Sequence, residues 1–176
     1  MSTLWHSSFV SLMEELLNRY ERDARLAGVV YIHRISDMRF TGISGRNLKM
    51  LRNLCGDTTL KNVVLVTNRW GEVSPEIGEA REWELCNRFF KPVLDKGAQM
   101  ARHHNTAQSA HDIIRRIMVN YSEALQIQYE MVDEHKDIVD TAAGEAINLD
   151  FDGLIRRHQA ELKEVGDEVK SFWLRT

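Results

Sequence analysis

The residues best placed to do chemistry lie in the stretch Asn62–Gly71, at the end of an apolar run. Val63–Thr67 contains only apolar or β-branched residues, with no polar residue alternating among them, which is typical of a strand buried on both faces of a parallel sheet. The run ends in the cluster Asn68-Arg69-Trp70-Gly71. Ligands of open α/β sheets bind at the carboxyl ends of strands. We therefore expect any small-molecule site of this chain to lie at this cluster.

Other polar groups have simpler interpretations. His103, His104 and His111 are the histidines that one metal ion might bring together, but no cysteine accompanies them and the adjacent pair points in different directions, so we predict no metal site. Cys55 and Cys86 form no ligand spacing and have no His/Asn partner set, which indicates buried thiols. Ser36-Asp37 either orients a ligand at a strand end or starts a turn.

Composition excludes several classes of function. The 176 residues are 43% apolar and 28% charged, with a net charge of −3 and scattered lysines and arginines. A nucleic-acid binder needs a dense basic face, so we expect no nucleic-acid partner. No run of 18 apolar residues occurs and Glu14-Glu15 interrupts the amino-terminal apolar pattern, so we predict neither a membrane span nor a signal peptide, and a cytoplasmic location.

The elements that position the cluster follow from the apolar spacing. The order of helices and strands predicts parallel strands joined by right-handed crossovers. The spacing predicts a helix over about Ser7–Leu26, a buried strand Val29–Ile35, a short helix marked by Leu48–Leu54, a strand Asn62–Thr67, a helix from a Ser74 cap and Pro75 to Pro92, and a weaker strand Ala98–Arg102.

The remaining chain is predicted to be helical. Asn105-Thr106 caps a long helix whose seam-like pattern runs from Ala110 to Met131, interrupted by Gln128. The small residues of Thr141–Asn148 predict a break, and Phe151–Leu174 is again helical. We expect these two helices to pack as a hairpin.

Several segments then fall into a familiar order. They are Gly28–Asp37, Asn47–Cys55 with Gly56-Asp57, Asn62–Trp70, Gly78–Glu82, Phe90–Gly97 and Asn105–Ile114. Together they resemble the second half of fungal G-domain P-loop NTPases, distant relatives of septins and immune-associated GTPases. The resemblance covers about Phe9 to Leu162. It implies an α/β fold: a partial P-loop NTPase-like three-layer sandwich of about three parallel strands in residues 1–105, with a C-terminal helical hairpin in residues 106–176 packed on it.

Two motifs of that family are missing from the sequence. The phosphate-binding loop GxxxxGK[ST] does not occur, and Gly42–Arg46 lacks its lysine and its spacing. The DxxG segment, which senses the γ-phosphate beside magnesium, is absent too, so the resemblance implies that the chain begins just after it. GTP or GDP is the ligand that the resemblance implies, without Mg²⁺, because the phosphate loop is missing.

The resemblance also assigns the strand-end cluster to base recognition. Asn68-Arg69-Trp70-Gly71 stands where the family has an NKxD-type element that reads guanine. The resemblance implies that Asn68 faces the base, that Arg69 lays its guanidinium over the purine, and that His104 adds a contact from the loop after the third strand. Gly71 replaces the aspartate that accepts two hydrogen bonds from guanine, so base discrimination is weakened. The competing interpretation is a plain strand-end loop, with Trp70 packing on the helix that carries Trp83.

Two functions remain open. The first is a truncated or degenerate GTPase-like domain with weak or no nucleotide binding, no catalytic residues and no independent hydrolysis, since phosphoryl transfer depends on the loop, its lysine and magnesium. The second is an interaction module, in which the helices of Thr106–Thr176 or an exposed sheet edge at Val29–Ile35 bind a protein partner or a second copy.

Overall fold

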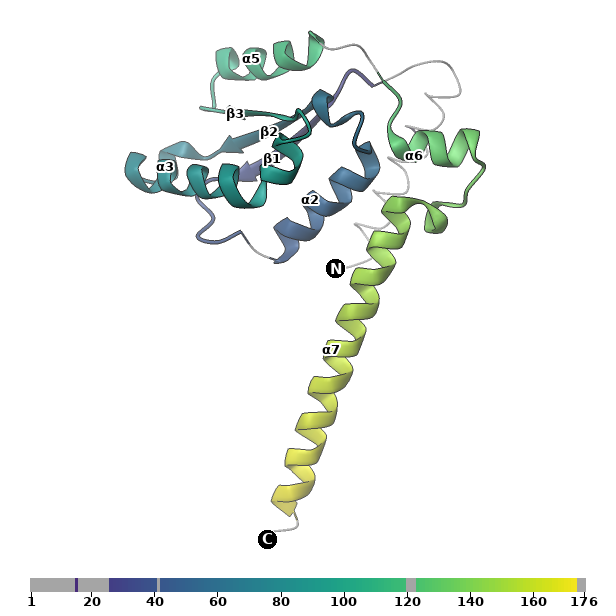
Figure 1. Cartoon of the computed structure of the whole chain (residues 1–176). Coiled ribbons are helices and arrows are strands. Elements are labelled where there is room, and N and C mark those ends of the chain that lie inside the picture. The colour runs from purple at the N-terminus through teal and green to yellow at the C-terminus, as the bar shows by residue number, and fades with distance from the viewer. Residues whose placement is uncertain (1–14, 16–25, 41, 120–122, 174–176) are drawn as a thin grey trace.

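Three parallel strands form the centre of the molecule (Figure 1). The computed structural model describes residues 15, 26–40, 42–119 and 123–173. The strands are β1 (Val29–Arg34), β2 (Val63–Asn68) and β3 (Gln99–Arg102), in the spatial order β1-β2-β3. This confirms the predicted parallel sheet. The helix predicted over about Ser7–Leu26 lies, apart from its residues 15 and 26, outside the described residues.

Helices cover both faces of β2, which explains its unbroken apolar sequence. On one face Val64 and Val66 pack against Ile113 of α5 (Ala107–Met118). On the other face, Val63 and Leu65 belong to a larger core. That core is built with α2 (Gly42–Cys55) and with the chain that runs through α3 (Pro75–Glu84), a π-helical turn (Leu85–Phe89) and α4 (Lys91–Leu94). Figure 1 shows α5 on one side of the sheet and α2 and α3 on the other.

The prediction that β1 is buried on both faces is wrong. Tyr31 and His33 face the larger core, where their rings pack against Phe90. The alternate residues Val30 and Ile32 are 38% and 60% exposed. Among the described elements, α5 covers this face over β2 and β3 only, which leaves β1 open.

Two predicted helix starts are confirmed by their caps. The Ser74 hydroxyl accepts a hydrogen bond from the backbone N–H of Ile77 at 3.4 Å, and Pro75 occupies the first turn of α3. The Thr106 hydroxyl accepts from the backbone N–H of Ser109 at 3.2 Å at the start of α5. Each cap fixes the direction of a helix that follows one of the two outer strand ends.

The long helix predicted after Thr106 is wrong, because α5 ends at Met118. The chain continues to a helical turn, α6 (Gln126–Gln128), and a π-helical turn (Tyr129–Asp133). Leu125 and Ile127 are buried in the core on the α2 side of the sheet, so the chain must leave the face that α5 covers. The fully buried side chain of Gln128 accepts a hydrogen bond from the backbone N–H of Leu125 at 2.9 Å, which satisfies its oxygen there.

The break predicted at Thr141–Asn148 is also wrong, because α7 (Ala142–Trp173) begins inside it and runs without interruption. The small residues allow close packing instead: a Cβ on Gly144 would lie 2.0 Å from the carbonyl oxygen of Ile138, and Ala143 and Ala146 are buried. α7 packs on α2, and α5 packs on β2 and β3. The two do not form the expected hairpin, and α7 extends away from the sheet (Figure 1). The predicted division at residue 105 stays a prediction.

Short 3-10 turns complete the described chain, at Leu60–Asn62, Trp70–Glu72 and Ile138–Asp140. The first leads directly into β2 and the second follows its end. Among the described residues, no helix combines the length and the apolar character that crossing a membrane requires.

Candidate functional site

A cavity of about 500 Å³ lies where β2 and β3 end. Neighbouring parallel strands end at the same edge of a sheet, so the two loops that follow them meet. Its volume is within the range of small-molecule sites, about 300–1,000 Å³. It is lined by Asn68, Arg69, Trp70, Gly71, Glu72, His103, His104 and Asn105. The fold thus brings the three predicted site residues, Asn68, Arg69 and His104, to one cavity.

Asn68 carries an unpaired polar atom at this cavity. Its backbone oxygen accepts a hydrogen bond from the N–H of Ile35 at 3.0 Å, which ties β2 to the end of β1. Its side-chain Oδ1 is buried and accepts no hydrogen bond from the residues that the structure describes. A buried acceptor without a donor costs on the order of 1–3 kcal/mol, so this atom is poised for a donor on a ligand.

Two residues of the cavity have an unusual backbone conformation. Arg69 has a φ of 61° and Asn105 a φ of 58°, both in the left-handed region. Only a few per cent of non-glycine residues adopt this region, and such residues are frequent in binding sites. One lies in each of the two loops, immediately after β2 and shortly after β3. Both loops therefore turn sharply at the cavity.

The guanidinium of Arg69 is engaged within its own loop. It forms an ion pair with the carboxylate of Glu72. Hydrogen bonds from Arg69 and then from Ser36 lower the pKa of Glu72. Both side chains of the ion pair are about half exposed, and exposed pairs contribute about 0–1 kcal/mol. Arg69 can therefore leave Glu72 at little cost, but in this structure it does not lie over the cavity as a stacking platform.

Trp70 forms the rigid part of the β2 loop. Its indole N–H donates to the backbone oxygen and the hydroxyl of Thr67, both at 3.2 Å. The ring packs on α3 at Gly78, where a Cβ would come within 2.8 Å of it. α3 is the helix that carries Trp83, so the packing expected for a strand-end loop is present. The same packing holds the loop that contains Asn68 and Arg69, and it leaves both interpretations of the loop open.

The β3 loop contributes two histidines in different roles. His103 is half-buried and its Nδ1 lies 2.9 Å from the hydroxyl of Ser109 in α5. His104 is exposed, and its ring lies 6.2 Å from that of Trp70 with 48° between the planes. His104 is therefore the histidine with a side chain near the β2 loop, as the resemblance implies.

Gly71 stands in open space. A Cβ added there would meet no heavy atom within 4 Å, and its backbone does not need the left-handed conformation. A side chain at this position would therefore fit without strain. The glycine is not required for folding of the loop, so its effect on the site is chemical: no carboxylate is present where the family has one.

Arg102 and Glu82 were missed by sequence reasoning. Arg102 ends β3, and its Cζ lies 4.1 Å from the centroid of the Trp70 ring. Its Nε is 2.9 Å from both carboxylate oxygens of Glu82 in α3. The available signal was that Arg102 closes the predicted strand Ala98–Arg102, and so belongs to the same sheet edge as Asn68.

The other candidate groups are structural where they are described. The backbone N–H of Asp37 donates to the oxygen of Arg34 at 3.2 Å, so Ser36-Asp37 forms a turn. Cys55 is buried and Cys86 half-buried. Within residues 26–40, 42–119 and 123–173, no three side chains of His, Cys, Asp or Glu lie close enough to hold a metal ion.

A scan against protein-family models found no match for the chain, and neither did searches of curated proteins and of solved structures.

Proposed function

We propose that this chain is a degenerate GTPase-like domain of the P-loop NTPase type, which keeps the base side of a guanine-nucleotide site and lacks its phosphate side. It binds a purine nucleotide weakly through Asn68, Arg69 and His104. It does not hydrolyse GTP alone.

The arrangement of the sheet supports this proposal. Parallel strands in sequential order, with helices on both faces, are what the second half of such a domain would contribute. The NKxD-like cluster follows β2, and the loop with His104 follows the neighbouring β3. Both loops line one cavity, as a base site built from two strand ends requires.

One observation carries the proposal: the buried, unpaired Oδ1 of Asn68 at the wall of that cavity. A purine offers N–H donors that could satisfy this acceptor, and the exposed Arg69–Glu72 ion pair can open to free a guanidinium for stacking. Binding would therefore relieve a cost that the unliganded protein bears.

The phosphate side has no corresponding residues. The sequence contains no GxxxxGK[ST] loop, so no cradle of backbone amides and no lysine is available for the β- and γ-phosphates. Since positioning and charge neutralisation supply nearly all of the rate of phosphoryl transfer, we expect no turnover. We expect affinity to depend little on the number of phosphates or on magnesium.

Calorimetric titration with guanosine, GDP, GTP and ATP, with and without magnesium, tests the proposal. Weak binding that is similar for the guanine ligands and is lost in Asn68→Ala is the expected result. Absence of binding to any of them would contradict it, as would GTP turnover by the purified chain that disappears in Asn68→Ala.

Gly71→Asp is the sharper variant, because the space for it exists. The new carboxylate can accept two hydrogen bonds from guanine and none from adenine, so the preference for guanosine over adenosine should rise about tenfold or more. Gly71→Asn is the matched control: it has nearly the same shape but no charge. Equal base preference in the two variants would show that Gly71 does not face a base.

A second function, protein binding through the sheet edge, is favoured by one observation. Among the described strands, β1 pairs only with β2, and a cavity of about 720 Å³ lies along its other side, between β1 and the start of α2. Open edges add strands from other chains. If this edge self-associates, Ile32→Lys should abolish the dimer in sedimentation velocity. Val139→Lys, at another exposed apolar residue, should not.

A further inference from the structure

The far part of α7 exposes a regular apolar seam. Phe151, Ile155, Leu162 and Val165 are 49%, 52%, 73% and 56% exposed, and His158 completes the spacing between Ile155 and Leu162. The intervals along this seam are four, three, four and three residues. This heptad spacing is the pattern of a helix that packs along a second helix.

The seam begins where the body of the molecule ends. The first turns of α7 are held by α2: the side-chain amide of Asn53 donates to the backbone oxygen of Ala142 at 3.2 Å. Beyond these turns α7 extends away from the sheet and from the other described helices (Figure 1). An isolated helix is marginally stable in water, and apolar burial supplies most helix stability. The seam therefore needs a partner.

The amino-terminal sequence carries a matching seam. Phe9, Met13, Leu16 and Tyr20 are separated by four, three and four residues. This spacing reads the same in both directions, so an antiparallel helix would match the first four seam positions of α7. The paired residues would be Tyr20 with Phe151, Leu16 with Ile155, Met13 with His158 and Phe9 with Leu162.

The described chain brings this segment to the base of α7. Leu26 forms an isolated antiparallel bridge with Glu123, three residues before α6. The segment therefore ends on the body at the α6 side, from which α7 also departs (Figure 1). Twelve residues of helix, Phe9–Tyr20, span about 18 Å, as do Phe151–Leu162 of α7. The segment is thus in reach and of matching length.

We propose that the amino-terminal segment Phe9–Tyr20 is a helix that docks antiparallel on the exposed seam of α7. In this arrangement the two chain ends form one intramolecular coiled coil that projects from the α/β body. The pairing register places a-type positions against d-type positions throughout, as antiparallel coiled coils require.

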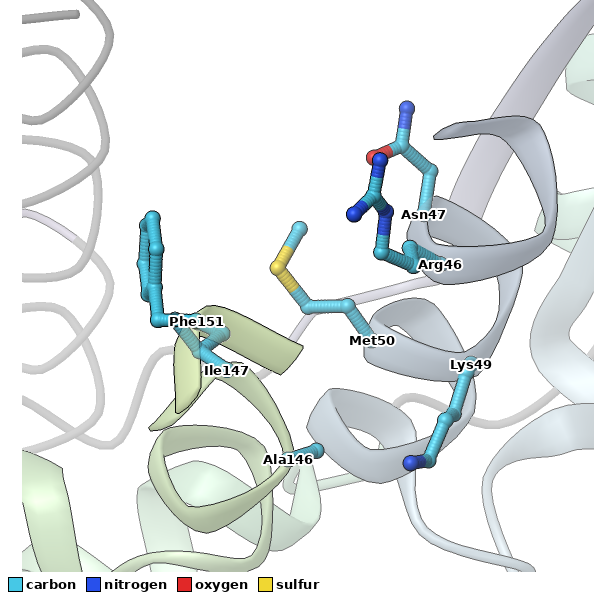
Figure 2. Close-up of a pocket in the computed structure, with 7 residues that line it drawn as sticks. All are labelled: Arg46, Asn47, Lys49, Met50, Ala146, Ile147 and Phe151. Carbon is cyan, nitrogen blue, oxygen red and sulfur yellow. The ribbon is translucent and has the colours of Figure 1, made fainter. Parts of the chain in front are cut away.

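An apolar pocket marks the inner end of this interface. It has a volume of about 200 Å³ and lies between α2 and α7 (Figure 2). Met50 of α2 reaches toward Phe151 of α7, with Ile147 behind and Arg46 at the rim (Figure 2). A segment whose Tyr20 meets Phe151 would cover this pocket on its way to Leu26.

Charges agree with the same register. The residues after Tyr20 include Glu21 and Asp23, which would pass the basic rim of the pocket at Arg46. Farther out, Glu14-Glu15 would lie level with Arg156-Arg157 of α7. These pairs occupy outer positions, where they attract over a Debye length of about 8 Å rather than by contact.

A second copy of the chain is the competing occupant of the seam. The tethered segment has the advantage, since a short linker gives an effective concentration on the order of millimolar. Dilution separates the two, because an intramolecular pairing does not weaken on dilution. A dimer does.

Disulfide trapping tests the proposal in the full chain. In a Cys86→Ser background, Leu16→Cys with Ile155→Cys should oxidise to a crosslinked monomer whose yield is independent of protein concentration. Leu16→Cys with Arg156→Cys is the matched control, because Arg156 is turned away from the seam, and it should not crosslink. A crosslinked dimer that disappears on dilution, or no crosslink in either pair, would overturn the proposal.

Thiol labelling provides a second readout that needs only one new cysteine. In Cys86→Ser with Ile155→Cys, a maleimide should react with Cys at position 155 about tenfold more slowly than in the same chain with Leu16→Glu added. Circular dichroism checks that both chains remain folded. Equal labelling rates in two folded chains would show that the segment does not cover the seam.

Discussion

The guanidinium of Arg102 lies over the indole ring of Trp70, with 4.1 Å between Cζ and the ring centroid. Arg102 ends β3 and Trp70 belongs to the loop after β2, so this contact joins the two loops that form the cavity. Glu82 holds the same guanidinium from α3. The shape of the cavity therefore depends on a contact between residues 32 positions apart, counted from their numbers in the sequence.

A double-mutant cycle of Arg102→Ala and Trp70→Ala should reveal this contact. We expect a coupling free energy of about 0.5–1 kcal/mol in urea denaturation, the usual size of a partly exposed cation–π pair. Adding Glu82→Gln to every member of the cycle should leave most of the coupling, because the ring contact does not need the carboxylate. Additivity of the two substitutions within about 0.3 kcal/mol would contradict the expectation.

Gly78→Ala should destabilise the protein although alanine favours helices. The new Cβ would meet the Trp70 ring at 2.8 Å and Val73 at 3.3 Å, and two hydrogen bonds from the indole N–H hold that ring in place. We expect a loss of about 1–3 kcal/mol, typical of overpacking. Gly153→Ala in α7 is the control: nothing lies within 4 Å, so it should stabilise by up to about 1 kcal/mol. Equal effects at both sites would show that Trp70 yields freely.

Stability should fall as the pH drops below about 6.5, because of His33. Burial among Phe40 and Phe90 lowers the pKa of His33 from its ordinary value of 6.5; Asp37 opposes this shift and Arg34 adds to it. The unfolded chain thus binds the proton at a higher pH than the folded chain. Between the two pKa values stability decreases by up to about 1.4 kcal/mol per pH unit, and above 6.5 this contribution is constant.

His33→Phe keeps an aromatic ring in the core and removes the titration. Urea midpoints measured from about pH 7.5 to about pH 5 should therefore fall less steeply in the variant than in the wild-type chain. A constant difference between the two proteins over this range would mean that His33 takes up its proton equally in both states.

Cys55 should resist alkylation in the folded protein. Its side chain is 1% exposed, and burial raises its pKa to about 12. Thiolate is the reactive form, so iodoacetamide at about pH 8 should leave Cys55 unmodified until the chain is unfolded. Half-buried Cys86, whose pKa is also raised by burial and by Glu82, should react first. Peptide mass spectrometry checks the order, and labelling of Cys55 at the rate of an unfolded thiol would contradict it.

Local signals predicted much of the α/β core from the sequence. The unbroken apolar run of β2, the caps Ser74 and Thr106, and the strand at Gln99–Arg102 each depend on neighbouring residues alone. The same holds for placing Asn68 and His104 at one sheet edge, since chain order and parallel pairing imply it. The function assigned to that edge stays a prediction.

The errors arose where distant segments decide the structure. β1 has the composition of a buried strand, yet Val30 and Ile32 are exposed because α5 packs over β2 and β3. Small residues near Gly144 resemble a break but allow α7 to lie close to the turn at Ile138. Neither outcome can be read from a local pattern, since both depend on which surface arrives from elsewhere in the chain.

The sequence by itself determined the element types, the parallel order and the polar cluster at Asn68, because hydrophobic period and capping act over a few residues. Only the tertiary structure decided that Arg102 and Glu82 hold Trp70, that the Asn68 Oδ1 is buried without a donor among the described residues, and that α7 projects with its seam exposed. These properties depend on packing between segments far apart in the chain, where burial and contact geometry are set by the whole fold.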